Sequence, residues 1–197
     1  FARTDDANFS TGDIHYVIAC WFNPENDLTT TVLVSKDFTG SNREYFISIG
    51  GSDDTVRWDV SGNGSTMTEV KATTPTITYG AWHLVIVDHN PTTNLISIQV
   101  DNGTIYTASH TTGSFDSTAA FQVSARNGNS IPFDGLLGPI MFWKREFFTQ
   151  DRTDLWNGGA GRTYASFSTA SSVSKILLLL SGRRENPLGT KGLWNDG

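Results

Sequence analysis

The chain has 197 residues and a formal net charge of −6, and only 17% of its residues are charged, so Thr, Ser, Asn and Gly must form much of its surface. An acidic chain without a basic stripe cannot release counterions from phosphates, which excludes nucleic acid as a partner and disfavours an anionic membrane surface. Its single cysteine, Cys20, excludes an internal disulfide framework, and no apolar run is long enough to insert into a membrane.

Short apolar stretches alternate with Gly, Asn, Asp and Pro about every dozen residues, which is typical of an all-β sandwich. Tyr45, Ile47 and Ile49 share one face of a strand, whereas Trp82–Val87 is apolar on both faces and indicates a central, covered strand. Asp101-Asn102-Gly103 predicts a tight hairpin through its Asn-Gly pair. The predicted strands are His15–Phe22, Thr31–Lys36, Tyr45–Ile49, Val56–Val60, Thr68–Ala72, Trp82–Asp88, Leu95–Val100, Thr104–Ser109, Ala120–Ser124 and Phe133–Lys144.

One short helix is predicted after the last of these strands. Thr149 can cap it, Gln150–Trp156 can form two turns, and Gly158 can end it in the left-handed conformation. Residues 163–175 are rich in Ser, Thr and Ala and are predicted to be a linker.

Three segments carry a family resemblance: Gly80–Asp88, Leu95–Gly103 and Phe133–Trp143. In this order they look like the signature of the laminin-G-like modules of the concanavalin-A-like superfamily, and the likeness extends from about Phe1 to Gly161. The resemblance implies an all-β fold over residues 1–162, a two-sheet antiparallel jelly-roll sandwich with one short helix. Such modules mostly bind glycans or proteins and seldom catalyse a reaction.

The carboxylates give no pattern for an enzyme. The catalytic relatives of these modules carry Glu-x-Asp-x-Glu on one strand, a spacing that points all three carboxylates to one face for glycoside hydrolysis. In this chain Glu25, Glu44, Glu69, Glu146 and Glu185 are scattered singly. The chain is therefore predicted not to be an enzyme.

The C-terminal residues 176–197 resemble the opening strand and loop of such modules. The strand is Ile176-Leu177-Leu178-Leu179-Leu180, although the aromatic and acidic residues expected around it are absent. Burying five apolar side chains stabilises a fold by about 10 kcal/mol, so this strand must be covered. It can complete its own sandwich as in a circular permutant, or a neighbouring copy by strand addition. A piece of a tandem array and an irregular tail over the sandwich are the other interpretations.

Two groups of residues are candidate binding sites. Arg57, Trp58 and Asp59 would present a tryptophan ring to a glycan, although most tryptophans of a sandwich lie in its core. No cofactor is required by the sequence, but two carboxylate pairs in loops could bind calcium, although solvated turn residues are the more common role of such pairs. These pairs are Asp5 with Asp6 and Asp53 with Asp54.

Together these observations predict a non-catalytic structural or adhesive subunit outside the cell, on a cell surface, a filament or a virion surface. Its expected partners are copies of itself, joined through the C-terminal strand, and a glycan. The alternative is a monomeric carbohydrate-binding module excised from a larger secreted protein.

Overall fold

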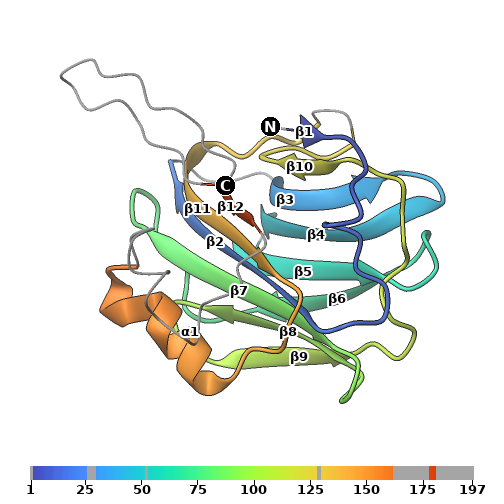
Figure 1. The fold of residues 1–197 in the computed structure, drawn as a ribbon. Helices are drawn as coiled ribbons and strands as arrows, with labels where there is room; N and C mark the ends of the chain where they lie inside the picture. The colour runs from blue at the N-terminus through green and yellow to red at the C-terminus, as the bar shows by residue number, and fades with distance from the viewer. Residues whose placement is uncertain (1, 26–29, 52, 128–129, 162–177, 181–197) are drawn as a thin grey trace.

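The structure, a computed structural model, describes residues 2–25, 30–51, 53–127, 130–161 and 178–180. It is a sandwich of two antiparallel sheets with one α-helix, which confirms the predicted fold class (Figure 1). All ten strands predicted for the sandwich are present, the short strand β1 is added at one sheet edge, and β12 lies within the predicted C-terminal strand. The elements are β1 (Ala2–Arg3), β2 (Tyr16–Pro24), β3 (Thr31–Phe38), β4 (Asn42–Gly50), β5 (Thr55–Ser61), β6 (Met67–Ala72), β7 (His83–Asn90), β8 (Leu95–Val100), β9 (Ile105–Ser109), β10 (Phe121–Val123), β11 (Gly135–Trp143), α1 (Thr149–Trp156), the 3₁₀ turn η1 (Asn157–Gly159) and β12 (Leu178–Leu180).

The strands divide into two six-stranded sheets. Sheet A has the order β1-β10-β3-β4-β5-β6, and sheet B has the order β12-β11-β2-β7-β8-β9. The β8–β9 hairpin turns through Asp101 and Asn102, which both have positive φ, while the Gly103 N–H bonds back to the Val100 carbonyl at 2.8 Å. The turn residues are therefore Asp-Asn rather than the expected Asn-Gly, because both Asp and Asn tolerate the left-handed region.

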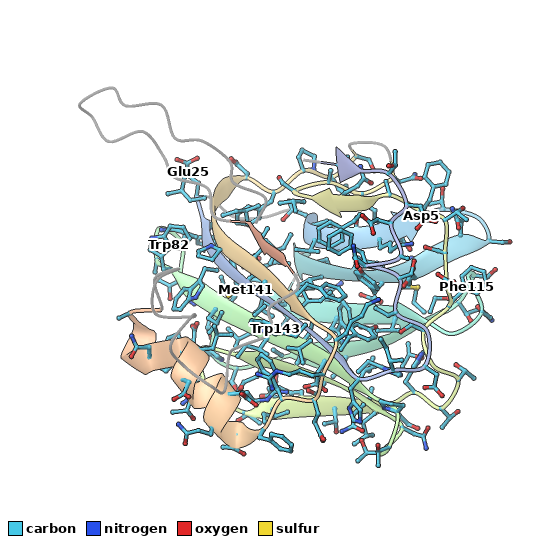
Figure 2. The ribbon with its side chains drawn as sticks, viewed as in Figure 1. Asp5, Glu25, Trp82, Phe115, Met141 and Trp143 are labelled. Carbon is cyan, nitrogen blue, oxygen red and sulfur yellow. The ribbon has the colours of Figure 1, made fainter. Side chains whose placement is uncertain are left out.

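The larger core lies between the two sheets and is rich in aromatic rings, so side chains crowd the space between the layers (Figure 2). Tyr16 of β2 stacks on Phe142 of β11 with ring centroids 6.1 Å apart, and its ring edge meets Trp58 of β5. Cys20 is fully buried in this core, and burial raises the pKa of its thiol. The cysteine is therefore a packed apolar group, as its strand pattern predicts.

Sheet B also buries its outer face. Alternate residues of β2 enter the inner core, while Val17, Ala19 and Trp21 point the other way and pack against Leu155 of α1. Met141 and Trp143 of β11 lie in the same outer cluster (Figure 2). The central strands of this sheet are thus covered on both sides, which is why Trp82–Val87 reads as apolar on both faces.

Helix α1 begins one residue earlier than predicted and ends at Trp156, as predicted. Thr149 is already helical and does not cap; Phe148 is the capping position, and its N–H donates to the Asp151 carboxylate at 2.8 Å. Asn157 takes the left-handed conformation directly after the helix, and Gly158, the residue predicted to do so, is left-handed as well. The Asp151 carboxylate thus binds the N–H of the capping residue itself, the contact that the third helical residue makes in a capping box. Among the described helices, none is long and apolar enough to cross a membrane.

A buried ion pair ties the N-terminal segment to sheet A. The Lys36 ammonium and the Glu44 carboxylate are both fully buried and lie 3.0 Å apart. Glu44 also accepts hydrogen bonds from Thr11 and Ser117, so two loops and two strands meet at one carboxylate. A buried charge is tolerated only when it is paired and hydrogen-bonded in this way.

The C-terminal strand lies at the edge of sheet B. Leu178–Leu180 form β12, which pairs antiparallel with Ile140–Phe142 of β11 in the same chain. The described part of the predicted assembly strand thus folds back onto its own sandwich. Ile176 and Leu177 lie outside the described residues, as do the predicted linker and residues 181–197.

Removing the guanidinium of Arg152 is predicted to destabilise the fold. Arg152 of α1 is 6% exposed and donates to Asp88 of β7, to Ser97 at 3.3 Å and to Gln99 at 3.3 Å. Arg152→Met leaves the Asp88 carboxylate against the sheet without its charge partner, which should cost about 3 kcal/mol in the free energy of urea unfolding. Gln150→Ala on the exposed side of the same helix is the control, and an equal effect of the two variants would contradict the anchoring role.

Candidate functional site

The outer face of sheet A carries two of the three residues predicted to bind a glycan. Because side chains alternate along β5, Arg57 and Asp59 point outward, whereas Trp58 points into the core and is 0% exposed. The expectation that Trp58 offers an exposed ring is therefore wrong, since this ring fills the space between the sheets. Arg57 and Asp59 remain as polar groups of this face.

Asp59 lies on this face without a partner. It is 6% exposed, and it makes no hydrogen bond or ion pair with any other described residue. Its cross-strand neighbours are Phe46 of β4 on one side and Glu69 of β6 on the other. Burial and the nearby negative charge of Glu69 raise the pKa of Asp59 to about 7. A carboxyl in this state is half ionised near neutral pH and can accept or donate a hydrogen bond.

Two arginines lie beside Asp59 on the same face. Arg43 and Arg126 each direct their Nε–H group to one oxygen of the buried Asp37 carboxylate, Arg43 at 2.9 Å. The guanidinium carbon of Arg126 lies 4.3 Å from the centroid of the Phe46 ring, and that of Arg43 lies 5.8 Å from it. Asp37 and Phe46 thus fix both guanidinium groups, while the terminal amino groups of Arg126 have no recorded partner in the described part of the chain.

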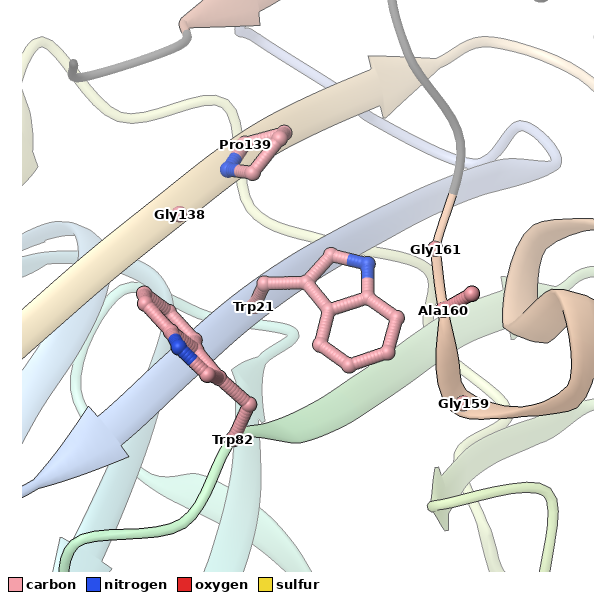
Figure 3. A pocket seen from close by; sticks show the side chains of 7 residues that line it. All are labelled: Trp21, Trp82, Gly138, Pro139, Gly159, Ala160 and Gly161. Atoms are coloured by element: carbon pink, nitrogen blue, oxygen red, sulfur yellow. The ribbon is translucent and has the colours of Figure 1, made fainter.

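A hollow of about 330 Å³ lies on the other side of the sandwich, on the outer face of sheet B. Trp21 lies between Trp82 and the segment Gly159–Gly161, and Pro139 borders a third side (Figure 3). Trp82 is 45% exposed, whereas Trp21 is 7% exposed and stacks on Trp156 of α1 with centroids 5.6 Å apart and planes 7° apart. The result is a fixed indole at the base and a second, solvent-exposed indole beside it.

Glycines keep this hollow open. A Cβ on Gly138 would lie 2.7 Å from the Trp21 Cβ and 3.2 Å from the Trp82 ring, and one on Gly161 would lie 3.2 Å from the Trp21 ring. Gly138 and Pro139 occupy the irregular step of β11, between Leu137 and Ile140, where the register against β2 shifts. A bulge of this kind leaves its residues out of the ladder and redirects the strand locally.

The loop that carries Trp82 is anchored on three sides. The ring of His83 bonds Asp101 at 2.5 Å through Nδ1 and the Thr78 backbone through Nε2. The Asn23 side-chain amide donates to the Gly80 carbonyl at 3.2 Å. Burial by itself lowers the pKa of His83, but the hydrogen bond and charge of Asp101 outweigh it and raise the pKa above its usual value. His83 therefore ties the loop before Trp82 to the β8–β9 turn.

Three of the four residues predicted to bind calcium contact other groups of the chain. Asp5 pairs with Lys36 at 2.9 Å, and Asp6 accepts a hydrogen bond from the Asn8 backbone at 2.9 Å. Asp53 pairs with Arg57 at 2.7 Å, and this hydrogen bond holds the pKa of Asp53 well below its usual range. Asp54 has positive φ and one buried oxygen without a partner. Within the described ranges, no three His, Cys, Asp or Glu side chains gather into a metal-ligating group.

The carboxylates do not reproduce the catalytic arrangement of glycosidases on one strand. Glu44 is held in its buried ion pair, and Glu146 accepts a hydrogen bond from Asn90 at 3.2 Å. Asp59 and Glu69 lie directly opposite each other on neighbouring strands. A pattern of carboxylates along one strand cannot predict such a pair. The only signal for it in the sequence is the β5–β6 hairpin through Gly62-Asn63-Gly64, which brings residues ten apart into register.

Comparisons with known proteins agree with this geometry. The concanavalin A-like lectin/glucanases superfamily model matches residues 2–151. A putative carbohydrate binding protein from Bacteroides ovatus ATCC 8483 superposes with a TM-score of 0.67 at 13% identity, over 99% of this chain and 52% of that one. This chain therefore spans about half the length of that protein. No curated protein matches the sequence significantly.

Two further solved structures share the fold. Domain 4 of AbnA, an extracellular GH43 arabinanase from Geobacillus stearothermophilus solved with arabinotriose, has a TM-score of 0.57 at 17% identity, covering 78% of this chain and 70% of that one. The SAP-like pentraxin of Limulus polyphemus has a TM-score of 0.57 at 12% identity, covering 78% and 79%. At these identities the likeness is one of fold.

Asp59→Asn is predicted to stabilise the protein at high pH. The pKa of Asp59 is raised from 3.8 to about 7, so the folded state holds this proton more tightly than the unfolded chain does. Ionisation of Asp59 therefore opposes folding, and the loss of stability develops between about pH 4 and about pH 7 and is constant above.

The variant should be about 2–4 kcal/mol more stable than the native protein at pH 8 and nearly equal to it at pH 4. Urea unfolding at both pH values measures the difference. The control is Asp53→Asn on the same face, which should lower stability rather than raise it because Asp53 is paired with Arg57. An Asp59 variant with the same effect at both pH values would show that the carboxyl is not held protonated.

Proposed function

Because this chain belongs to the concanavalin A-like lectin/glucanases superfamily, we propose that it is a non-catalytic module that binds carbohydrate on the outer face of sheet B. The observation that carries the proposal is the hollow formed by Trp21 and Trp82, with its 45% exposed indole. Two indoles side by side in a hollow offer a continuous apolar surface, which is typical of a ligand-binding groove, whereas a single exposed ring is not.

The physical argument rests on the fixed positions of both rings. The apolar face of a sugar ring packs well on an indole, and a ring that is already in place loses little conformational freedom on binding. Trp21 is held by Trp156, and the Trp82 loop is held by His83 and Asn23.

The comparisons support this reading over the self-assembling subunit. The Bacteroides ovatus structure is described as a putative carbohydrate binding protein, and the AbnA domain was solved with arabinotriose. The pairing of β12 within its own chain leaves strand donation to a neighbouring copy without support. We therefore favour the alternative, a carbohydrate-binding module of an extracellular protein, and infer that it binds its ligand without hydrolysing it.

Trp82→Ala should abolish or strongly weaken glycan binding while leaving the fold intact. An array of neutral and acidic glycans, run with and without calcium because Asp54 keeps an unpaired oxygen, identifies a ligand, and titration calorimetry then measures its affinity. Loss of the exposed ring should weaken binding by about tenfold or more, with a change in unfolding free energy of about 1 kcal/mol or less.

The matched control is Phe38→Ala, because Phe38 is 50% exposed at the end of β3 and does not border the hollow. It should bind the glycan as the native protein does. If Trp82→Ala retains full affinity for every glycan that the native protein binds, the proposed site is wrong.

Gly138→Ala tests the hollow without removing a ring. The added methyl group would meet the Trp21 Cβ at 2.7 Å, so Trp21 or the β11 bulge must shift. Overpacking of this kind costs about 1–3 kcal/mol of stability, and we expect glycan affinity to fall together with a change in tryptophan fluorescence. Gly12→Ala is the control, because nothing lies within 4 Å of its added methyl group, although its positive φ costs some stability. Unchanged fluorescence and affinity in Gly138→Ala would contradict the proposed role of the hollow.

A further inference from the structure

We propose that the outer face of sheet A holds a second ligand site, in which Asp59 and Arg126 bind adjacent hydroxyl groups of a neutral oligosaccharide. This site goes beyond the proposed function, because it lies on the sheet opposite the Trp82 hollow and does not depend on it. The sandwich would then bind glycan chains on both of its outer faces.

The first observation is a mostly buried carboxyl group whose oxygens still reach solvent and which no described residue pairs. Asp59 is 6% exposed, points away from the inner core and has no hydrogen bond or ion pair to any described residue. Buried carboxyl groups are normally paired or hydrogen-bonded, so one without a partner calls for an explanation. Each of the other carboxylates close by on this face is already paired: Asp37 with Arg43, Asp53 with Arg57, and Glu69 with Lys71 at 3.5 Å. Asp59 is the exception among them.

The second observation is a row of side chains that runs across the sheet. The β3–β4–β5–β6 register places Ser35 opposite Phe46, Phe46 opposite Asp59, and Asp59 opposite Glu69. Arg126 lies over the Phe46 ring, one position from Asp59, and only its Nε is engaged, by Asp37. An acceptor and a set of unused donors therefore lie on one face of the sheet, with Arg126 positioned by Phe46 and Asp37.

This pairing of groups selects the ligand chemistry. Each sugar hydroxyl both donates and accepts a hydrogen bond, so two neighbouring hydroxyls match one carboxylate and one guanidinium. A phosphate or sulfate would meet the Asp59 and Glu69 carboxylates, and an ammonium ion would meet the arginines, so a neutral ligand fits best. The charged groups that face Asp59 from the surrounding elements are Glu69 of β6, Arg57 of β5, Arg43 of β4, and Arg126 after β10.

Binding at this site should depend on pH. A hydroxyl donates a stronger hydrogen bond to an ionised carboxylate than to a neutral one, so affinity should rise by about five- to tenfold between pH 5.5 and pH 8.5. By linkage, the bound sugar should lower the midpoint at which Asp59 titrates. The midpoint in the free protein, near 7, can be followed by carbon-13 NMR of the carboxyl group.

The experiment titrates the full chain with neutral trisaccharides, namely arabinotriose, xylotriose, cellotriose, laminaritriose and mannotriose, at both pH values. Amide NMR shifts report which sheet responds. The variants are Asp59→Asn, which keeps the shape of the side chain and removes its charge, and Trp82→Ala, which removes the other proposed site. Asp59→Asn should also be more stable at pH 8, so lost binding cannot be attributed to unfolding.

The proposal expects shifts on β4, β5 and β6 that persist in Trp82→Ala, strengthen at high pH and lose their pH dependence in Asp59→Asn. Shifts confined to the Trp82 hollow would overturn this inference and leave the proposed function standing. No shift on sheet A with any trisaccharide at millimolar concentration, or an Asp59 midpoint below 5 in the free protein, would also overturn it. Cleavage of a trisaccharide that stops in Asp59→Asn would replace a binding role with a catalytic one.

Discussion

The inner core between the sheets is the constraint on which both proposed sites depend. A strand sends successive side chains to opposite faces, so filling the interior with Trp58 forces Arg57 and Asp59 outward, and burying Cys20 and Phe22 forces Trp21 outward. A shift of one residue in either strand would exchange core and surface groups, which the apolar interior does not permit. The positions of the polar and aromatic groups on the outer faces therefore follow from core packing.

Three polar contacts fix what apolar packing leaves free. Arg152 holds α1 on sheet B through Asp88, which in turn keeps Trp156 against Trp21 at the base of the hollow. The Lys36–Glu44 pair closes the edge of the core next to the N-terminal segment. The His83–Asp101 contact fixes the loop that carries Trp82. In each of these three contacts a buried charged or polar group has its partner, whereas Asp59 has no hydrogen bond or ion pair with a described residue.

A carboxyl group without a partner lowers the stability of the fold when it ionises, and the raised pKa of Asp59 reflects this unfavourable ionisation. Such costs are common where a protein keeps a group ready for a ligand rather than for its own fold. The Trp82 indole carries a milder cost of the same kind, because it leaves apolar surface in water. The two outer faces of the sandwich thus differ in chemistry: one offers aromatic surface, and the other offers a carboxyl group and a guanidinium group.

The sequence alone determined the fold class, ten of the strands and the α-helix, because these depend on periodicity and on local turn residues. The lack of a catalytic carboxylate pattern on one strand is read directly from the residue order. The sequence also predicted Arg57 and Asp59 as candidate glycan-binding residues, but it misjudged the exposure of Trp58, since alternation gives two faces and only the second sheet decides which one is buried. The Trp82 hollow is lined by residues of β2, β11, the loop before β7 and the segment after α1. No sequence spacing predicts that these four segments meet. The isolation of Asp59 is likewise a property of three neighbouring strands. Only the tertiary structure could decide these points, because burial and pairing depend on contacts between residues far apart in sequence.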